Sequence, residues 1–497
     1  MTERRKRFYI NGVMLAIVGL AGRSVALFFN SYISRVIGAE GMGLFGLIST
    51  VYSFAVTFAT SGISLTVTKL TSQAIGEGRE GELSRILRAA LFYALLFSTV
   101  ASAALFLGAP YFAVAILKDS RAAPSLRVLA FSLIPLAVSS ALSGYFVGVR
   151  RISKNAIISI LGQGARILIT VLLLSRASGV SAEHGAYIIS LVMTITELIV
   201  LVLSVIQYLT ERHTRDMSRE KHLPAVCHMA LPLALSAYIR SAFLTLEHAL
   251  IPQKLRERGN SHEESLAAYG TLHGMALPLL LYPMSPLSSF AGLLVPEFSE
   301  SMAKGEKERL TRIASEALNT TLKYSVVVLA LIALFSEELG YAVYGSYEAG
   351  AYIAFLAPVI PLMYLDHVTD SMLKGIGEQV YSMWVNITDS FLSVILVVIL
   401  IPRMGIIGYA LVILIMEMYN FLLSIIRLYR RIPFKINPFS SLIRPLISSI
   451  AAALLTRTLF VSASSNTAPV WLFLEVIFAI CIFVAADNIL KRLSTAR

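Results

Sequence analysis

The sequence predicts an all-α polytopic membrane protein with about 14 transmembrane helices, arranged as two six-helix lobes followed by two C-terminal helices. Three observations predict this fold class. Apolar segments of spanning length recur along the chain, Lys and Arg gather at every second junction, and landmarks of the first half return in the second. Of 497 residues, 56% are hydrophobic and 14% are charged, whereas about a quarter are charged in soluble domains.

Each apolar segment is near or above the ~20 residues that cross ~30 Å of hydrocarbon. In chain order the segments are 8–33, 41–68, 88–117, 125–149, 155–175, 184–209, 225–251, 266–295, 317–344, 349–373, 380–402, 405–429, 438–461 and 468–490. The junctions between them are short and leave no room for a soluble catalytic domain. We therefore expect polar residues inside the membrane to carry the function.

The positive charges predict the orientation. The net charge of +12 would suggest nucleic acid as a partner of a soluble protein, but its placement argues against one. About 29 of the 42 Lys and Arg fall at the termini and the even-numbered junctions. This positive-inside pattern predicts cytoplasmic termini and contacts with anionic membrane lipids. The cytoplasmic junctions are expected near 71–87, 150–154, 210–223, 297–314, 374–379 and 430–437.

An internal duplication predicts the two lobes. Three glycine landmarks recur at separations of 224, 227 and 223 residues, each at the same point in the order of segments. The pairs are Gly46 and Gly270, Gly148 and Gly375, and Gly185 and Gly408. A repeat of an even number of helices gives both lobes the same orientation, which is one of the repeat types of secondary transporters.

The predicted domains are an N-terminal lobe at 1–210, a C-terminal lobe at 224–431 and two extra helices at 438–491. Two lobes suggest a cleft that rocking exposes to each side of the membrane in turn. The alternative is a rigid bundle without transport, such as a membrane-embedded transferase or an assembly scaffold.

Five segments at these landmarks resemble a known family. They are GAEGMGLFGLISTVYSF (38–54), GYFVGVRRISKNAIISILGQGAR (144–166), YGTLHGMALPLLLYPMSP (269–286), LVPEFSE (294–300) and LKGIGE (373–378). The chain is similar to the polysaccharide-transport branch of the multidrug/oligosaccharidyl-lipid/polysaccharide exporter superfamily, and most similar to its stage V sporulation protein B group, relatives of the lipid II flippases. The motifs are mostly turns and helix ends, so they indicate the fold better than the substrate.

The resemblance implies fourteen helices in two lobes around a central cavity, in the bacterial cytoplasmic membrane. It implies flipping of an undecaprenyl-pyrophosphate-linked oligosaccharide or a lipid II-like precursor, with a spore-cortex role as one expectation. Cell-wall synthases are expected partners on the same ground.

Three arginines lie at bilayer depth, where ionisable residues are costly and usually face a cavity or a partner. They are Arg23, Arg166 and Arg240. Arg23 and Arg240 lie on spans that are equivalent in the repeat, and each is followed seven residues later by a polar residue, Asn30 and Glu247. Guanidinium groups pair bidentately with phosphate oxygens, so we expect Arg23, Arg166, Arg240 and Asn30 to bind a pyrophosphate. The alternative is that the arginines pair with intramembrane carboxylates such as Glu197 or Glu247.

Most intramembrane acids lie in the second half. We expect a cation-coupling site built from Glu247, Asp366, Asn386, Asp389 and Glu417, because oxygen ligands suit Na⁺ and a buried carboxylate can carry a proton. The first half has Asn30 and Gly162 at the places of Glu247 and Asp389, so the lobes have diverged in acidity. Na⁺ and H⁺ both remain open.

Three prolines at 278, 283 and 286 interrupt the eighth segment. Each removes a backbone donor and bends the helix. A static kink and a gating hinge are both consistent with the sequence, and we favour the kink.

No enzyme motif is present, since the chain has no glycine-rich phosphate loop with lysine, no HExxH and no GxSxG. Its two cysteines, Cys227 and Cys481, give neither a disulfide framework nor metal-ligand spacing, so no metal or cofactor is expected. We therefore expect a flippase driven by an ion gradient or membrane potential. A cation-coupled multidrug exporter of the same fold, a membrane-embedded glycosyltransferase and a non-transporting cell-wall scaffold are the alternatives.

Overall fold

A computed structural model of the chain describes residues 3–60, 62–176, 181–210, 223–460 and 469–495. These residues form α-helices and short 3₁₀- or π-helical turns, without a strand. The α-helices are α1 Glu3–Thr60, α2 Ile63–Gly76, α3 Leu83–Tyr111, α4 Ala122–Ala130, α5 Leu133–Gly148, α6 Ile152–Ser175, α7 Ala182–Leu209, α8 Leu223–Glu257, α9 His262–Tyr269, α10 Leu277–Leu281, α11 Ser285–Ala303, α12 Lys307–Leu334, α13 Ser336–Tyr344, α14 Tyr347–Leu356, α15 Ile360–Gly375, α16 Gln379–Met404, α17 Ile406–Arg431, α18 Arg444–Phe460 and α19 Pro469–Thr495. The all-α class predicted from the sequence is confirmed.

The described part contains ten helices that are long and apolar enough to cross a membrane, or up to twelve if two bent pairs are counted as spans. The protein is therefore a multi-pass membrane protein, and the count of fourteen stays a prediction. Each predicted apolar segment coincides with a helix or with consecutive helices. The junction expected at 210–223 lies, apart from its end residues, outside the described residues.

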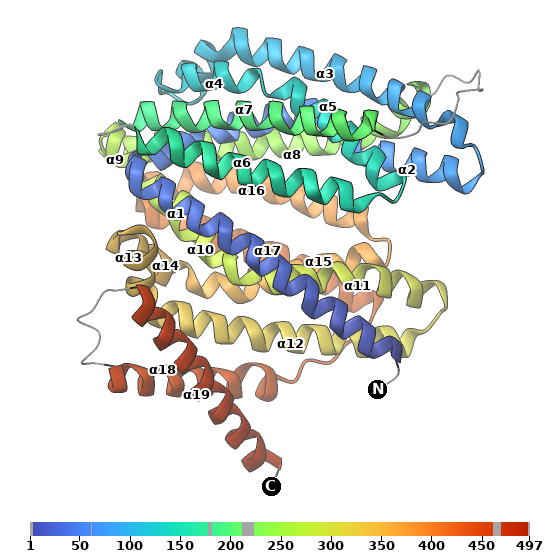
Figure 1. Cartoon of the computed structure of the whole chain (residues 1–497). Coiled ribbons are helices and arrows are strands. Elements are labelled where there is room, and N and C mark those ends of the chain that lie inside the picture. Colours follow the sequence, from blue (N-terminus) through green and yellow to red (C-terminus); the bar gives the residue numbers. More distant parts are fainter. Residues whose placement is uncertain (1–2, 61, 177–180, 211–222, 461–468, 496–497) are drawn as a thin grey trace. The chain divides into compact units, whose positions relative to one another are not determined.

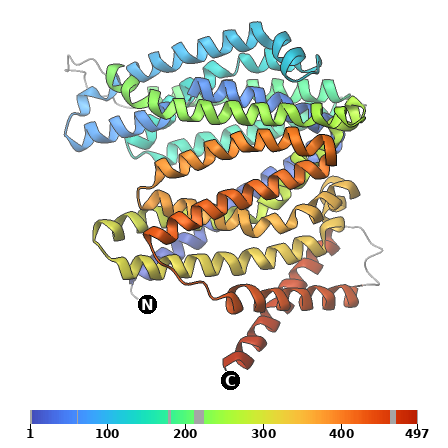
Figure 2. The same cartoon turned by 180° about the vertical axis from the view of Figure 1, so that it is seen from behind.

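Contacts between Cα atoms divide the chain into two compact units, drawn in Figures 1 and 2. Unit 1 comprises Met1–Arg35 and Ala268–Arg497, and unit 2 comprises Val36–Ala267. Helix α1 passes from unit 1 to unit 2 just before Gly38, whose φ of 71° and ψ of 179° interrupt its helical geometry. The predicted lobes at 1–210 and 224–431 follow chain order instead, and they stay a prediction, as does the pair at 438–491.

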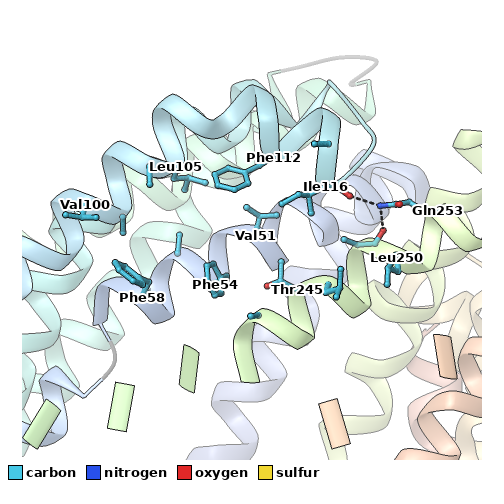
Figure 3. Close-up of a pocket in the computed structure, with 17 residues that line it drawn as sticks. Val51, Phe54, Phe58, Val100, Leu105, Phe112, Ile116, Thr245, Leu250 and Gln253 are labelled. Atoms are coloured by element: carbon cyan, nitrogen blue, oxygen red, sulfur yellow. Dashed lines mark hydrogen bonds between the residues drawn. The ribbon is translucent and has the colours of Figure 1, made fainter. Parts of the chain in front are cut away.

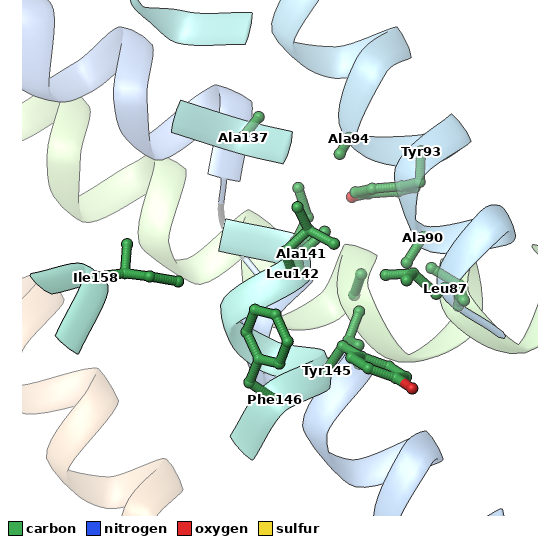
Figure 4. Packing of buried hydrophobic residues seen from close by; sticks show 14 residues of the cluster. Leu87, Ala90, Tyr93, Ala94, Ala137, Ala141, Leu142, Tyr145, Phe146 and Ile158 are labelled. Atoms are coloured by element: carbon green, nitrogen blue, oxygen red, sulfur yellow. The ribbon is translucent and has the colours of Figure 1, made fainter. Parts of the chain in front are cut away.

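The core of unit 2 is built from α2, α3, α5, α6 and α8. Figure 4 shows Ala141 and Leu142 of α5 beside Leu87 and Ala90 of α3. Small side chains recur along α5 at Ala137, Ala141, Gly144 and Gly148. Because lipid tails are as apolar as leucine, helices in a bilayer associate mainly through the close packing that such residues permit.

One close helix contact occurs in both units at the spacing of the repeat. In unit 2, a Cβ placed on Gly148 would lie 2.7 Å from Thr71 Cβ and 3.1 Å from the Thr68 carbonyl oxygen. In unit 1, a Cβ on Gly375 would lie 2.6 Å from Phe298 Cβ and 2.9 Å from the Val295 carbonyl oxygen. All three positions differ by 227 residues, so α5 packs on α2 as α15 packs on α11.

We expect Gly148→Ala to destabilise the protein by about 1 to 3 kcal/mol, because the added methyl group overpacks the contact with α2. The measurement is the thermal unfolding of the purified protein in detergent. Gly164→Ala on α6 is the matched control, since its Cβ would meet no atom within 4 Å. Equal unfolding temperatures for the two variants would contradict the prediction.

In unit 1, helices α18 and α19 cross each other, and α18 packs against α12 (Figures 1 and 2). Their anchor is Asp487 of α19, which is 5% exposed. Its carboxylate accepts from Lys323 Nζ of α12 at 2.6 Å and from Arg444 Nε of α18 at 2.8 Å. One buried acid thus joins three helices through two cations.

Candidate functional site

Arg23 and Asn30 of α1 donate to the backbone of the proline-interrupted segment in unit 1. Arg23 Nη1 donates to the Leu281 carbonyl at 2.7 Å, and Asn30 Nδ2 donates to the Gly274 carbonyl at 2.8 Å. Between these positions along α1, the Ser24 hydroxyl lies 2.7 Å from the Tyr282 hydroxyl. One face of α1 is therefore joined to this segment by polar contacts.

One proline explains why the Gly274 carbonyl needs a side-chain donor. Pro278 has no N–H for the carbonyl four residues before it, that of Gly274, and Asn30 supplies the missing donor. Tyr364 of α15 and Tyr324 of α12 add hydrogen bonds to the carbonyls of Leu280 and Pro283 in the same segment, at 2.9 and 2.7 Å. Because residues from three other helices hold the kink in place, these bonds favour the static interpretation over a hinge.

The other two predicted arginines lie in unit 2. Arg166 of α6 pairs with Glu197 of α7, with Nη2 and Oε1 3.3 Å apart. This is the structural pairing that the sequence left open as an alternative to phosphate binding. Arg240 lies on the exposed side of α8, and Glu247 on the same helix is 8% exposed.

Four of the predicted coupling residues lie on neighbouring helices of unit 1. Glu417 of α17 interacts electrostatically with Asp366 of α15 and Asp389 of α16. Ser424 on α17 lies near Asp366. Asn386 is on α16, where its Nδ2 donates to the Ser382 carbonyl at 2.7 Å. Within unit 1 the structure therefore brings three predicted carboxylates near one another, with Ser424 beside them. Glu247 belongs to unit 2.

The oxygens of this cluster are suited to a proton. Asp366 Oδ1 and Asn420 Oδ1 are buried and have no hydrogen-bond partner within the described residues. A proton bound to the Asp366 carboxylate would turn that carboxylate into a hydrogen-bond donor. No group of three or more His, Cys, Asp or Glu side chains in the described ranges is close enough to hold a metal ion.

A second charged cluster lies outside the spans, in unit 2. Asp119, 5% exposed, precedes α4 and accepts from Arg121 Nη2 at 2.9 Å and His262 Nε2 at 2.7 Å. Arg121 Nη1 also donates to Glu40 of α1 at 2.7 Å. Burial raises the pKa of Asp119, but the hydrogen bonds from Arg121 and His262 outweigh burial and lower it below its ordinary value.

This lowered pKa predicts a pH-dependent stability. The Asp119 carboxylate stabilises the fold above its unfolded pKa of about 3.9, and this contribution is lost as the pH falls through the lower folded pKa. As the pH falls, we expect the unfolding temperature of Asp119→Asn to decrease less than that of the parent. The control Glu263→Gln, at an exposed position of α9, should keep the parent profile. If the unfolding temperature of Asp119→Asn depends on pH as that of the parent does, Asp119 does not cause the pH dependence of stability.

Comparison with known proteins identifies the class. The model of the family described as "Polysaccharide biosynthesis protein" matches residues 9–302, which is more than half of the chain. The chain therefore belongs to the polysaccharide biosynthesis protein family. The resemblance drawn from the sequence motifs to the polysaccharide-transport branch is confirmed.

Two relatives from Bacillus subtilis (strain 168) match most of the chain. Stage V sporulation protein B is 24% identical over 82% of this chain and 81% of its own length. Lipid II flippase MurJ is 24% identical over 70% of this chain and 69% of its own length.

Solved structures share the fold. A structure of Lipid II flippase MurJ in an inward closed conformation has a TM-score of 0.66 at 15% identity and covers 99% of both chains. An inward-facing multidrug resistance MATE family transporter has a TM-score of 0.67 at 16% identity and covers 85% of this chain and 98% of its own.

Sequence reasoning missed two features of the site. The tyrosines at 324 and 364 were absent from the predicted set, because no local sequence signal places them against the carbonyls of Leu280 and Pro283. The Asp119 cluster was missed because its members are far apart in the sequence. Its only local signal is an aspartate two residues before an arginine at a helix start.

Proposed function

We propose that this protein is a flippase for a lipid-linked cell-wall or polysaccharide precursor, such as an undecaprenyl-pyrophosphate-linked oligosaccharide or a lipid II-like molecule. The observation that carries the proposal is the match along most of the chain to the protein named Lipid II flippase MurJ. The match to Stage V sporulation protein B supports a role in sporulation, for which we propose spore cortex peptidoglycan as the pathway. The relatives reported above bear no enzyme's name, so we assign transport and not catalysis.

In this proposal two lobes alternate in exposing a binding site to the two faces of the bacterial cytoplasmic membrane. Arg23 is the strongest candidate for the pyrophosphate, because its side chain is half-buried at bilayer depth and carries five donors in a planar fork. Arg240 and Asn30 are secondary candidates. Arg166 is the weakest, since Glu197 already pairs with its charge.

We further propose that a proton taken up by the carboxylates at 366, 389 and 417 drives the cycle. Their proximity on α15, α16 and α17 supports this assignment. A proton can couple to transport only as far as its affinity differs between the two arrangements of the lobes. Cell-wall synthases are proposed partners on the named roles of the relatives alone.

The test is translocation by the purified full-length chain in proteoliposomes. Fluorescent lipid II and a fluorescent lipid-linked oligosaccharide are supplied in separate vesicles, and the fraction reaching the opposite leaflet is measured by quenching from outside. Translocation of either above the rate of protein-free vesicles supports the proposal. A protein that moves neither, yet accumulates an amphipathic cation, would be the exporter that the sequence left as an alternative.

The proposed orientation places both termini in the cytoplasm, on the basis of the Lys and Arg asymmetry. We expect a cysteine at the exposed Glu308 to react only with reagents that reach the cytoplasm, in a variant without Cys227 and Cys481. The control Glu263→Cys, in an expected external junction, should be labelled from outside. Labelling of both sites from outside would contradict the orientation.

A further inference from the structure

Unit 2 contains an apolar pocket of about 620 Å³, shown in Figure 3. Its floor is α1 at Val51, Phe54 and Phe58, and its walls are α3, the π-turn Phe112–Ile116 and α8. Of its lining residues only Thr245 and Gln253 are polar. None of the residues that line the pocket belongs to the predicted binding or coupling sets.

The hydrogen-bond donors of the two polar lining residues are already engaged by the protein. Thr245 Oγ1 donates to the carbonyls of Ser241 and Thr50 at 2.8 and 3.1 Å. Gln253 Nε2 donates to the carbonyls of Ile116 and Ala249 at 2.6 and 2.9 Å. The lining contains no charged residue. A cation, a phosphate or a sugar would lose its hydration here without replacement, so the occupant must be hydrocarbon.

The rim of the pocket is continuous with the exposed apolar surface of two helices. On α3, Val100 and Ala104 at the rim belong to an exposed stripe that continues through Leu96 and Leu107. On α8, Ala242 and Leu246 at the rim continue an exposed stripe formed by Leu235 and Ile239. In a multi-pass membrane protein such stripes face acyl chains. A chain can therefore enter from the bilayer without leaving hydrocarbon.

We propose that this pocket binds one acyl chain of a bilayer phospholipid as a resident ligand. The phospholipid is chosen because the pocket opens onto the bilayer itself, where that chain is the most abundant hydrocarbon. The pocket extends inward from the rim, so a chain in it contacts Leu105 and Val51, which are 2% and 5% exposed. Contact with those residues distinguishes a chain inside the pocket from lipid around the protein.

The experiment uses the full chain in vesicles that contain a phospholipid with a diazirine in the middle of one acyl chain. After irradiation, labelled residues are identified by mass spectrometry. We expect labels on Leu105 and Val51. Ala104→Phe should reduce them about tenfold, because a phenyl group displaces several methylene groups from the pocket. Ala103→Phe is the matched control, since Ala103 is an exposed neighbour outside the pocket.

Labels confined to the exposed stripes, or equal labelling of Leu105 in the two variants, would overturn the proposal. Ala242→Phe fills the pocket from the opposite wall and replaces Ala104→Phe if that variant fails to fold. In a parallel arm, a small fraction of undecaprenyl phosphate is added to the vesicles. If it removes the label from Leu105, the pocket holds an isoprenoid chain and the assignment to phospholipid is wrong.

Discussion

Arg23→Ala should abolish complementation of a transport-deficient strain while the protein still accumulates in the membrane. Losing one partner of a buried, hydrogen-bonded charge pair costs about 2 to 5 kcal/mol, which is at least about 30-fold in binding of an anionic headgroup. The loss of the bond to the Leu281 carbonyl costs only about 1 kcal/mol. Transport should therefore fall much more than stability.

Two further variants separate binding from the structural bond. Arg23→Lys keeps a donor for the Leu281 carbonyl but lacks the planar fork, so it should restore stability fully and transport only in part. Ser24→Ala removes the neighbouring contact with Tyr282 without changing charge, and it should transport normally. Full activity of Arg23→Ala would refute a role in pyrophosphate binding. If Arg23→Lys restores stability and transport fully, the only role left for Arg23 is its hydrogen bond to the Leu281 carbonyl.

Asp389→Asn should transport without responding to an imposed pH gradient. A gradient of one pH unit is worth about 1.4 kcal/mol per proton, so the parent should change its accumulation ratio by about tenfold if one proton is coupled. The variant keeps the side-chain shape but cannot exchange a proton. The measurement is precursor translocation in proteoliposomes at equal and unequal internal and external pH.

The matched control is Asp370→Asn, because the salt bridge of Asp370 with Lys374 at 2.6 Å already accounts for that carboxylate. It should keep the gradient response of the parent. If Asp389→Asn also keeps it, Asp389 is not a coupling residue, and Glu417→Gln and Asp366→Asn become the decisive variants. If all three respond as the parent does, the carboxylates of unit 1 do not couple transport to protons.

The helices could be predicted because membrane-spanning length and hydropathy are local properties of the chain. The breaks inside them were harder to predict. Helices α4 and α5 meet at a bend of 43°, and Pro135 lies four residues after Phe131 at that bend. Proline leaves one carbonyl without its helical donor, but whether the helix bends or continues depends on what packs around it.

The candidate site was predictable in residue type but not in contacts. Intramembrane charge is rare enough that Arg23, Asp366 and Glu417 could be selected from the sequence alone. The carbonyl that Arg23 meets depends on which helix packs against α1, and the sequence carries no local signal for that. The duplication gives only an equivalence: once the contact of Gly148 with Thr71 is known, the offset of 227 residues predicts that of Gly375 with Phe298.

The ion pairs of Asp487 with Lys323 and Arg444 determine how this protein can be shortened. A chain ending before α19 would lose Asp487 and leave both Lys323 and Arg444 without that counter-ion. Two uncompensated cations beside a bilayer repel each other, so removing the helix would damage α12 and α18 as well. The C-terminal helices, which the sequence predicts to lie outside the duplication, thereby contribute to the stability of α12. Deletion should succeed only when both basic residues are neutralised in the same step.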